Sequence, residues 1–387
     1  MSGGRVLAID QLRATVAELS DRWHREAATA TFFEDHAVPL VEGNVATFAV
    51  IAEADAVYLR HRINAWPDDL ELARIPGTDL WFLTIQLEWR SRVEYQFEIR
   101  RDGQWWRFND PYNQRLARSP VGDCSVCCGP GYAVPDWATF RAETDPGELV
   151  DLQVHSTAQG RDNRITVYLP ARFETSMPYP LLVVHDGGDY LDYASMKLVL
   201  DNLIHDKKLA KIIVAFTHPG ERLTEYPDNP DHAQWITREL LSRLEREFPL
   251  LAAPSGRCLM GTSFGAVAAL STAVRFADVY GSLLLQSGSF LHSDPAVWHG
   301  EGATVFDPVV RFIDRYRAAP VRAVDRAFIS CGSYEDLVDA NRAMLPIFRR
   351  TGMKINYVES RDGHSWESWR DQLGTGLCWL FPGDGGE

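Results

Sequence analysis

The residues best suited to chemistry lie in GTSFGAVAAL, residues 261–270, where a serine stands between two glycines. The preceding RCLM has the apolar character of a strand end, and FGAVAALSTAVRF, which follows the serine, predicts a helix. A serine at a sharp strand-to-helix turn presents its hydroxyl for reaction. Gly261 and Gly265 fit this turn, because close packing of the strand on the helix needs small residues. The pattern predicts Ser263 as a nucleophile, the alternative being an ordinary turn serine.

A nucleophilic serine needs a general base, and three histidines follow Ser263 in the chain. His364 comes just after the last expected strand, in VESRDGHSWESWR. That is the place of the base where the chain order is Ser, then Asp or Glu, then His. His292 and His299 follow QSGSF in a polar stretch, and we expect them to be loop residues. We predict His364 as the base, the alternative being a surface or packing histidine.

The acid that orients the base should follow the strand before it, which we place in AFISCG. The next loop offers Glu335 and Asp336 side by side, and the residue types alone do not separate them. Asp339 is less suitable, because it should already lie on the following helix. Either of the first two carboxylates could instead be a favourable charge at a helix N-terminus.

Acyl transfer by such residues needs N–H donors for the oxyanion of the tetrahedral intermediate. The first donor should be the backbone N–H of Phe264, directly after the nucleophile. The second should come from the loop after an earlier strand, where VVHDGGDY offers Gly187 and Gly188. We assign this role to Gly187. The chemistry requires no cofactor and no metal.

Composition limits the classes of partner. The chain has 387 residues, enough for two domains, and its 45% hydrophobic and 24% charged residues are typical of soluble globular proteins. Its net charge of −14 disfavours nucleic acid and anionic membranes, since both need a basic surface. A local basic pocket for a small anionic substrate is still compatible with this balance. The chain shows neither signal-peptide features nor a long apolar run, so we expect a cytoplasmic protein without a membrane span.

Three of the six cysteines cluster as Cys124, Cys127 and Cys128 in DCSVCCGPGY. A metal site would need a second pair of ligands nearby, and neither a further Cys pair nor a His pair with suitable spacing accompanies them. Small buried thiols in a reducing compartment are the preferred interpretation.

Two element patterns divide the chain. The first part begins with helical spacing over residues 5–25 and continues with strand-like runs, which predict a small antiparallel β-sandwich. The second part alternates strands and helices after an initial hairpin, which predicts a doubly wound, mostly parallel α/β sheet. The expected strand-like runs of the first part are 46–63, 80–89 and 92–113. The expected domains are 1–130 and 150–387, joined by a Gly- and Pro-rich linker at 131–149.

Residues 150–387 resemble the enterochelin (enterobactin) esterase branch of the putative-esterase family of α/β hydrolases. The matching landmarks occur in order: LLVVHDGGDY, PGERLTEY, GTSFGAVAAL, LLQSGSF, CGSYEDLVDANRAM and DGHSWESWR. The first domain, from VYLRHRINAW to WWRFNDPYN, is similar to the early-set β-sandwich found ahead of these esterases and to glycogen-binding-type modules.

The resemblance implies a cytoplasmic hydrolase that opens the trilactone of a ferric catecholate siderophore and so helps to release iron. It implies Ser263 as nucleophile and His364 as base, and the family's spacing after CG favours Glu335 as the acid. Arg222 and Glu225 match an Arg-x-x-Glu segment that lines the cleft in the family. This arginine either contacts anionic catecholates or pairs with Glu225.

Two other functions are compatible with the sequence. A carbohydrate-ester hydrolase of the feruloyl or acetyl type would share the catalytic residues, although most such enzymes act outside the cell. Trp66, Trp89, Trp105 and Trp106 could then stack on sugars, or they are core and domain-interface residues. A catalytically silent binding protein on the same fold is the third possibility. In each case the expected partner is a small-molecule ester, and the sequence leaves the oligomeric state open.

Overall fold

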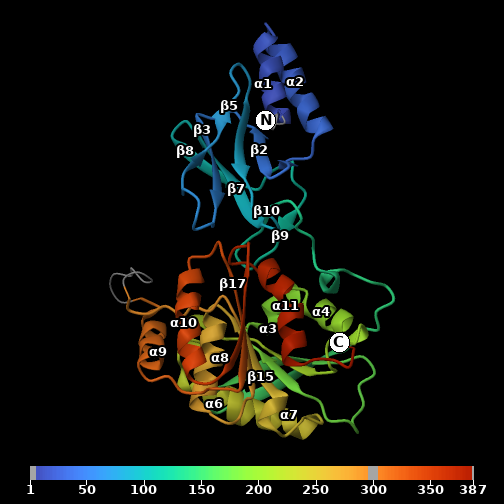
Figure 1. Cartoon of the computed structure of the whole chain (residues 1–387), viewed down its shortest axis with the longest axis vertical. Helices are drawn as coiled ribbons and strands as arrows, with labels where there is room; N and C mark the ends of the chain where they lie inside the picture. The colour runs from blue at the N-terminus through green and yellow to red at the C-terminus, as the bar shows by residue number, and fades with distance from the viewer. Residues whose placement is uncertain (1–5, 295–303, 386–387) are drawn as a thin grey trace. The chain divides into compact units, whose positions relative to one another are not determined.

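A computed structural model describes residues 6–294 and 304–385. The chain forms two compact units, of which the first comprises Met1–Ala133 together with Arg361–Gly363. The second comprises Val134–Ser360 and His364–Glu387 (Figure 1). No helix in the described ranges combines the length and the apolar character needed to cross a membrane.

The N-terminal unit opens with two helices in place of the single helix expected over residues 5–25. They are α1 (Ala8–Glu18) and α2 (Arg22–Asp35). The helix is interrupted because Leu19 is extended and the Asp21 side chain accepts a hydrogen bond from the His24 N–H, which caps α2. The apolar spacing conceals this break, since a short polar side chain offers the backbone an alternative partner without disturbing the pattern.

Two antiparallel sheets form the rest of this unit, in agreement with the predicted antiparallel pairing. Within the described residues one sheet has the strand order β1-β2-β6-β5, and the other has the order β4-β3-β7-β10-β9 with β8 paired to β7. The predicted strand-like run at 46–63 divides into β2 and β3, which belong to different sheets. The strands are β1 (Leu40–Glu42), β2 (Val45–Ile51), β3 (Ala56–His61), β4 (Leu70–Glu71), β5 (Ala73–Arg74), β6 (Leu80–Gln86), β7 (Arg92–Arg101), β8 (Gln104–Phe108), β9 (Leu116–Ala117) and β10 (Cys124–Cys128).

The cysteines and tryptophans singled out in the sequence lie in this unit. Cys127 is buried in β10, and burial raises the pKa of its thiol. Residues 6–294 and 304–385 contain no group of three His, Cys, Asp or Glu side chains placed to hold a metal ion. Trp89, Trp105 and Trp106 are 60%, 49% and 47% exposed, so the interpretation of these three as core residues is wrong.

The second unit is built on an eight-stranded sheet within the described residues, in the order β11-β12-β14-β13-β15-β16-β17-β18. The predicted hairpin is β11 paired to β12, and β12 runs antiparallel to β14. The remaining pairings, from β14 to β18, are parallel. The strands are β11 (Glu148–Ser156), β12 (Arg161–Leu169), β13 (Leu181–Val184), β14 (Ile213–Thr217), β15 (Arg257–Thr262), β16 (Ser282–Gln286), β17 (Arg326–Gly332) and β18 (Lys354–Ser360).

Helices cover both faces of this sheet (Figure 1). Successive side chains of a strand point to opposite faces, so Leu181 and Val183 of β13 enter one core while Leu182 and Val184 enter the other. The first core contains residues of α8 (Phe264–Arg275), α9 (Asp307–Ala318), α10 (Val338–Arg350), η2 (Trp235–Leu240) and α7 (Leu241–Glu247). The short helix α6 (Pro230–Gln234) leads directly into η2. The second core contains α3 (Gly187–Asp192), α4 (Met196–His205) and α11 (Trp366–Leu380).

The predicted linker at 131–149 is not a free connection, and the boundary between the units falls after Ala133. Trp137 and Thr139 accept hydrogen bonds from the Asn202 side chain through their backbone carbonyls. A Cβ placed on Gly374 would lie 2.6 Å from the Trp137 ring, which shows how closely this segment packs on α11. Its Gly and Pro residues predicted a loop, but the loop is anchored to the second unit.

The cap of α2 generates a prediction. Asp21→Ala should lower the free energy of unfolding by about 1 kcal/mol, because the first turn of the helix loses its acceptor. Asp35→Ala, at the other end of α2, is the matched control and should cost nothing, since a carboxylate near a helix C-terminus is unfavourable. Amide hydrogen exchange at His24 reports the cap directly. An unchanged exchange rate in Asp21→Ala would contradict the assignment.

Candidate active site

Ser263 occupies the turn between β15 and α8 with φ 55° and ψ −121°. A positive φ is strained for a residue with a side chain, and such strain collects at functional sites. Two backbone hydrogen bonds hold the turn. The Ser263 N–H donates to the Gln286 carbonyl at 3.0 Å, and the Ser289 N–H donates to the Ser263 carbonyl at 3.2 Å. The serine is therefore fixed from the loop after the neighbouring strand β16, and it presents a half-buried hydroxyl.

The two glycines beside the serine are required by packing, as the sequence predicts. A Cβ on Gly261 would lie 2.3 Å from the backbone carbonyl atoms of Gly265, so any side chain there would push α8 off β15. A Cβ on Gly265 would come within 3.2 Å of both His185 and Asp186. The glycines allow the close approach of strand and helix on which the turn depends.

The structure distinguishes Glu335 from Asp336, the two adjacent carboxylates between which the residue types alone do not decide. Glu335 is buried in the loop after β17, and its Oε2 lies 2.7 Å from Nδ1 of His364. Its Oε1 accepts hydrogen bonds from the Ser287 hydroxyl at 2.6 Å and from the Gly332 N–H at 2.7 Å. Asp336 is exposed. Asp339 lies on α10, as expected, where it pairs with an arginine.

His364 follows β18, and its imidazole ring is only partly exposed. Its side chain is 34% exposed, and Trp369 of α11 meets the ring edge-on at 4.9 Å. Trp369 also donates from Nε1 to the Ser287 hydroxyl, which in turn donates to Glu335. Because Nδ1–H is directed at the carboxylate, Nε2 is the nitrogen left to act as a base. No pattern in the sequence indicates the contacts of Ser287 and Trp369, because they join residues far apart in the chain.

Ser263, Glu335 and His364 lie at the carboxyl ends of β15, β17 and β18, which share one parallel sheet. The Ser263 hydroxyl is 3.1 Å from the hydroxyl of Ser289. Among the hydrogen bonds of the described residues, none joins Ser263 to His364. Catalytic hydrogen bonds often tighten only when substrate is bound.

The other two histidines after Ser263 do not join this group. His292 lies in the loop after β16, as expected, but it is buried there, and burial together with Arg317 lowers its pKa. His299 lies outside the described residues.

The expected oxyanion donors begin two helices. Gly187 is the first residue of α3 and Phe264 the first of α8, so neither N–H has an acceptor within its own helix. In the described chain no hydrogen bond of either amide is found. Gly187 must be glycine, because a Cβ there would lie 2.4 Å from the Phe216 side chain. Gly188 is similarly restricted, by His218 at 2.8 Å.

Arg222 binds Asp186, the residue before the expected oxyanion donor Gly187. Its Nε and Nη2 each lie 2.8 Å from one oxygen of the buried Asp186 carboxylate, and its guanidinium covers the rings of Tyr226 and Phe264. The alternative pairing of Arg222 with Glu225 is therefore wrong. Glu225 instead pairs with Arg161 at 2.7 Å. Neighbours in sequence suggested the pairing, but the bidentate partner comes from a strand end far away along the chain.

A cavity of about 520 Å³ is lined in part by Gly188, next to the expected oxyanion donor Gly187. Its polar lining combines the cations Arg164 and Lys197 with the acids Asp151 and Asp192. His218 also lines it, with its Nε2 3.1 Å from the Thr166 hydroxyl, and burial lowers its pKa. The cavity is therefore polar, with charges of both signs.

Residues 156–380, more than half of the chain, match the Putative esterase family. The chain belongs to this family. As a putative esterase it is 24% identical over 368 residues to an iron(III) enterobactin esterase of Dickeya dadantii (strain 3937), covering 82% of this chain and 80% of the relative. It is 24% identical over 351 residues to the Escherichia coli (strain K12) iron(III) enterobactin esterase, covering 83% and 84%.

Solved structures give the same fold. The ferric enterobactin esterase of Salmonella typhimurium superposes with a TM-score of 0.71 at 22% identity, covering 87% of this chain and 93% of that one. The Shigella flexneri enterobactin esterase, solved in the presence of enterobactin, gives 0.70 at 20% identity, covering 87% and 92%. A ferulic acid esterase gives 0.52 at 20% identity, with only 61% of this putative esterase covered and 98% of the other chain. The fold is that of an α/β-hydrolase-type esterase.

The adjacent acids provide a matched pair of variants. Glu335→Gln should lower kcat for a p-nitrophenyl ester by about 10⁴-fold, because an amide facing Nδ1 stabilises the wrong imidazole tautomer. Asp336→Asn changes an exposed neighbour in the same way and should leave kcat unchanged. Steady-state kinetics on both variants decide between them. Equal losses in the two variants, or a loss only in Asp336→Asn, would overturn the geometric assignment.

Asp189 of α3 gives a prediction about pH. Burial raises the pKa of this half-buried carboxyl to about 6, and the negative charge of Asp186 adds to the shift. A folded-state pKa above the unfolded value means that stability falls as pH rises from about 4 to about 6 and stays lower above that range. Asp189→Asn should therefore raise Tm at pH 7.5, and the gain should shrink as pH falls toward 4. A gain independent of pH in thermal unfolding would contradict this.

Proposed function

We propose that this chain is a serine esterase that hydrolyses the ester or lactone bonds of a ferric catecholate siderophore, releasing iron in the cytoplasm. One observation carries the catalytic part of the proposal. A buried carboxylate holds His364 by Nδ1 at the sheet edge where Ser263 stands in a strained strand-to-helix turn. This is the arrangement from which an activated serine nucleophile is built.

The proposed reaction uses only groups of the chain, the ester and water. Ser263 Oγ attacks the ester carbonyl while His364 Nε2 takes its proton, which first requires the hydroxyl to leave Ser289. Glu335 keeps Nδ1 protonated and stabilises the imidazolium. The amides of Phe264 and Gly187 receive the oxyanion, and one such donor typically contributes about 2.7–4 kcal/mol to lowering the barrier. His364 then protonates the leaving alcohol, and water hydrolyses the acyl-enzyme by the same steps.

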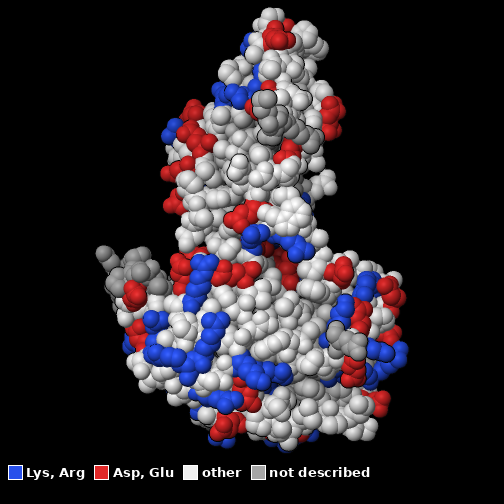
Figure 2. Space-filling view, viewed as in Figure 1, with Lys and Arg blue, Asp and Glu red and all other residues white. Residues whose placement is uncertain are grey.

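The similarity to named esterases supports the siderophore part. The similarity extends over 82% of the chain, well beyond the residues of the second unit. The relatives with this extended similarity are named iron(III) enterobactin esterases. The face of the molecule seen in Figure 2 does not by itself favour an anionic substrate. Figure 2 shows basic and acidic side chains interspersed over the second unit, in a chain of net charge −14. Recognition of a ferric catecholate is therefore assigned to local cations at the site.

Arg222 is the proposed substrate contact. Asp186 engages its Nε and Nη2, and no hydrogen bond of Nη1 is found within the described residues, so one edge of the guanidinium is available to a catecholate oxygen. Glu225 accepts hydrogen bonds from the backbone N–H groups of Gly220 and Glu221. We assign it to shaping the segment that carries Arg222. The cavity at Gly188, with Arg164 and Lys197, is the proposed place for a further part of the substrate.

A carbohydrate-ester hydrolase is the second candidate, and one observation favours it. Trp89, Trp105 and Trp106 are exposed on the N-terminal unit, where flat aromatic side chains can stack on sugar rings. Arg100 lies over the Trp105 ring and Tyr58 lies beside it, so this surface is already partly occupied by the chain's own side chains. The siderophore esterase is therefore the preferred function.

Mass spectrometry of ferric and iron-free enterobactin after incubation with the enzyme tests the proposal. Wild type should add water stepwise to the trilactone, whereas Ser263→Ala should leave it intact. A fluorophosphonate probe should label wild type at Ser263 and should leave Ser263→Ala unmodified.

Each result has one meaning. If the trilactone stays intact while p-nitrophenyl acetate is still cleaved, the assignment of the catalytic residues would stand and the siderophore would be rejected as the substrate. Feruloylated and acetylated sugars would then be tested. Absence of both labelling and ester cleavage in wild type would support the silent binding protein.

A further inference from the structure

Three residues directly before the proposed base belong to the N-terminal unit. Arg361–Gly363 lie between β18 and α11 in the chain, yet they cluster with Met1–Ala133, whereas Ser360 and His364 belong to the second unit. The chain thus enters the N-terminal unit for three residues and leaves it at the catalytic histidine.

A buried ion pair holds the excursion in place. Nη1 of Arg92, at the start of β7, lies 2.9 Å and 3.2 Å from the two carboxylate oxygens of Asp362. The two side chains are 1% and 7% exposed. Nη2 of Arg92 pairs with Glu94 on the same strand at 2.6 Å. A buried arginine is costly unless its charge is compensated, so Arg92 needs these carboxylates.

Arg361 adds a second set of contacts within the same unit. Its carbonyl accepts the Arg92 N–H at 2.9 Å, which extends β7 by one backbone hydrogen bond. Its side chain donates to the Trp89 carbonyl at 2.8 Å and pairs with Glu88 at 2.6 Å. The backbone and both charged side chains of the segment are therefore tied to the start of β7 and the loop before it.

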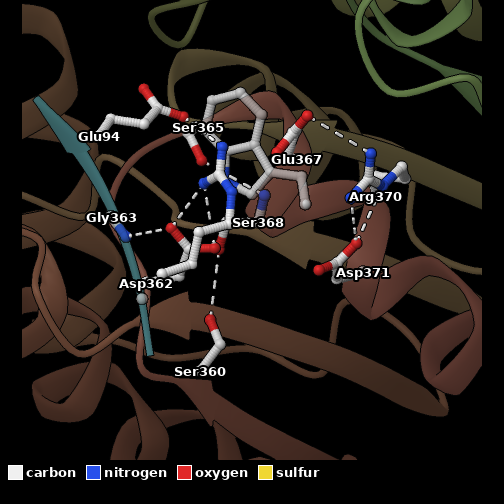
Figure 3. Close-up of polar contacts among 12 residues, drawn as sticks. Glu94, Ser360, Asp362, Gly363, Ser365, Glu367, Ser368, Arg370 and Asp371 are labelled. Carbon is white, nitrogen blue, oxygen red and sulfur yellow. Dashed lines mark hydrogen bonds and ion pairs between the residues drawn. The ribbon is translucent and has the colours of Figure 1, made fainter. Parts of the chain in front are cut away.

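The anchor reaches the residue next to the base. Oδ1 of Asp362 accepts the N–H of Gly363 at 2.7 Å, so the carboxylate that binds Arg92 also fixes the peptide leading to His364 (Figure 3). A Cβ on Gly363 would meet nothing within 4 Å, so packing around Gly363 itself does not restrain this peptide. The restraint comes from Asp362. Glu335 orients the imidazole through Nδ1, but it does not fix the backbone from which the ring projects.

We infer that Arg92 and Asp362 are positioning residues for the proposed base, because together they hold the backbone directly before His364. This inference rests on the proposed function, since it requires His364 to act on Ser263. A purely structural ion pair would affect unfolding and leave turnover per folded molecule unchanged.

Kinetics of the full chain distinguish the two roles. Arg92→Met and Asp362→Asn should each lower kcat for p-nitrophenyl acetate by about 10²-fold, the typical cost of a 1 Å misplacement, with KM changed less than about twofold. The rate at which a fluorophosphonate labels Ser263 should fall in proportion to kcat. The matched control is Arg60→Met, which breaks the Arg60–Glu98 ion pair between β3 and β7 of the same unit and should leave both rates unchanged.

A double variant covers the case in which single variants fold poorly. Arg92→Met with Asp362→Leu replaces both partners by apolar side chains, a change that commonly leaves stability unaltered. It should unfold like wild type in denaturant and still label about 10²-fold more slowly, because the Gly363 N–H has lost its acceptor.

Two results overturn the inference, and they differ from each other. Wild-type kcat and labelling rates in the folded double variant would make the pair structural only, with the proposed function intact. Failure of wild type itself to be labelled or to cleave the ester would remove the proposed function, and with it the base that Arg92 and Asp362 are inferred to position.

Discussion

The order of the site depends on one buried carboxylate. Glu335 receives hydrogen bonds from Ser287 and Gly332 on one oxygen and faces His364 with the other. These contacts come from the ends of three adjacent strands, β16, β17 and β18, and Trp369 of α11 closes the group by donating to Ser287. A carboxylate removed from water needs such partners, because an uncompensated buried charge is strongly unfavourable. The arrangement therefore fixes the strand ends as well as the imidazole.

A second buried carboxylate lies close to the helix turn that follows Ser263. Asp186 has a left-handed backbone, with φ 54° and ψ 39°. Its two carboxylate oxygens accept hydrogen bonds from Nε and Nη2 of Arg222. Its N–H donates to the Tyr226 hydroxyl. These contacts determine the direction in which the chain enters Gly187. Arg222 thus links the residue before the expected oxyanion donor to the segment in which Arg222 itself lies. For this reason an arginine expected to contact substrate makes most of its hydrogen bonds within the protein.

The sequence was most informative where function requires local geometry. The G-x-S-x-G turn, the strands that feed it and the helix that leaves it follow from small residues and apolar runs that can be seen within a short window. The choice of Glu335 over Asp336 could not be made from residue types, because it depends on which carboxylate is buried. The break before α2, the partner of Arg222 and the placement of 361–363 were missed for a common reason: each rests on a polar contact, and such contacts leave no periodic pattern in the chain.

The placement of Arg361–Gly363 in the N-terminal unit also bears on the order in which the molecule is completed. Chains are made from the N-terminus, and domains generally fold as units in that order. Met1–Ala133, Ser263 and Glu335 are all synthesised before this segment emerges. The groups on β7 and on the loop before it that bind Arg361 and Asp362 are therefore already present when these two residues appear. The segment directly before His364 is thus bound late, by a return of the chain to residues that were made first.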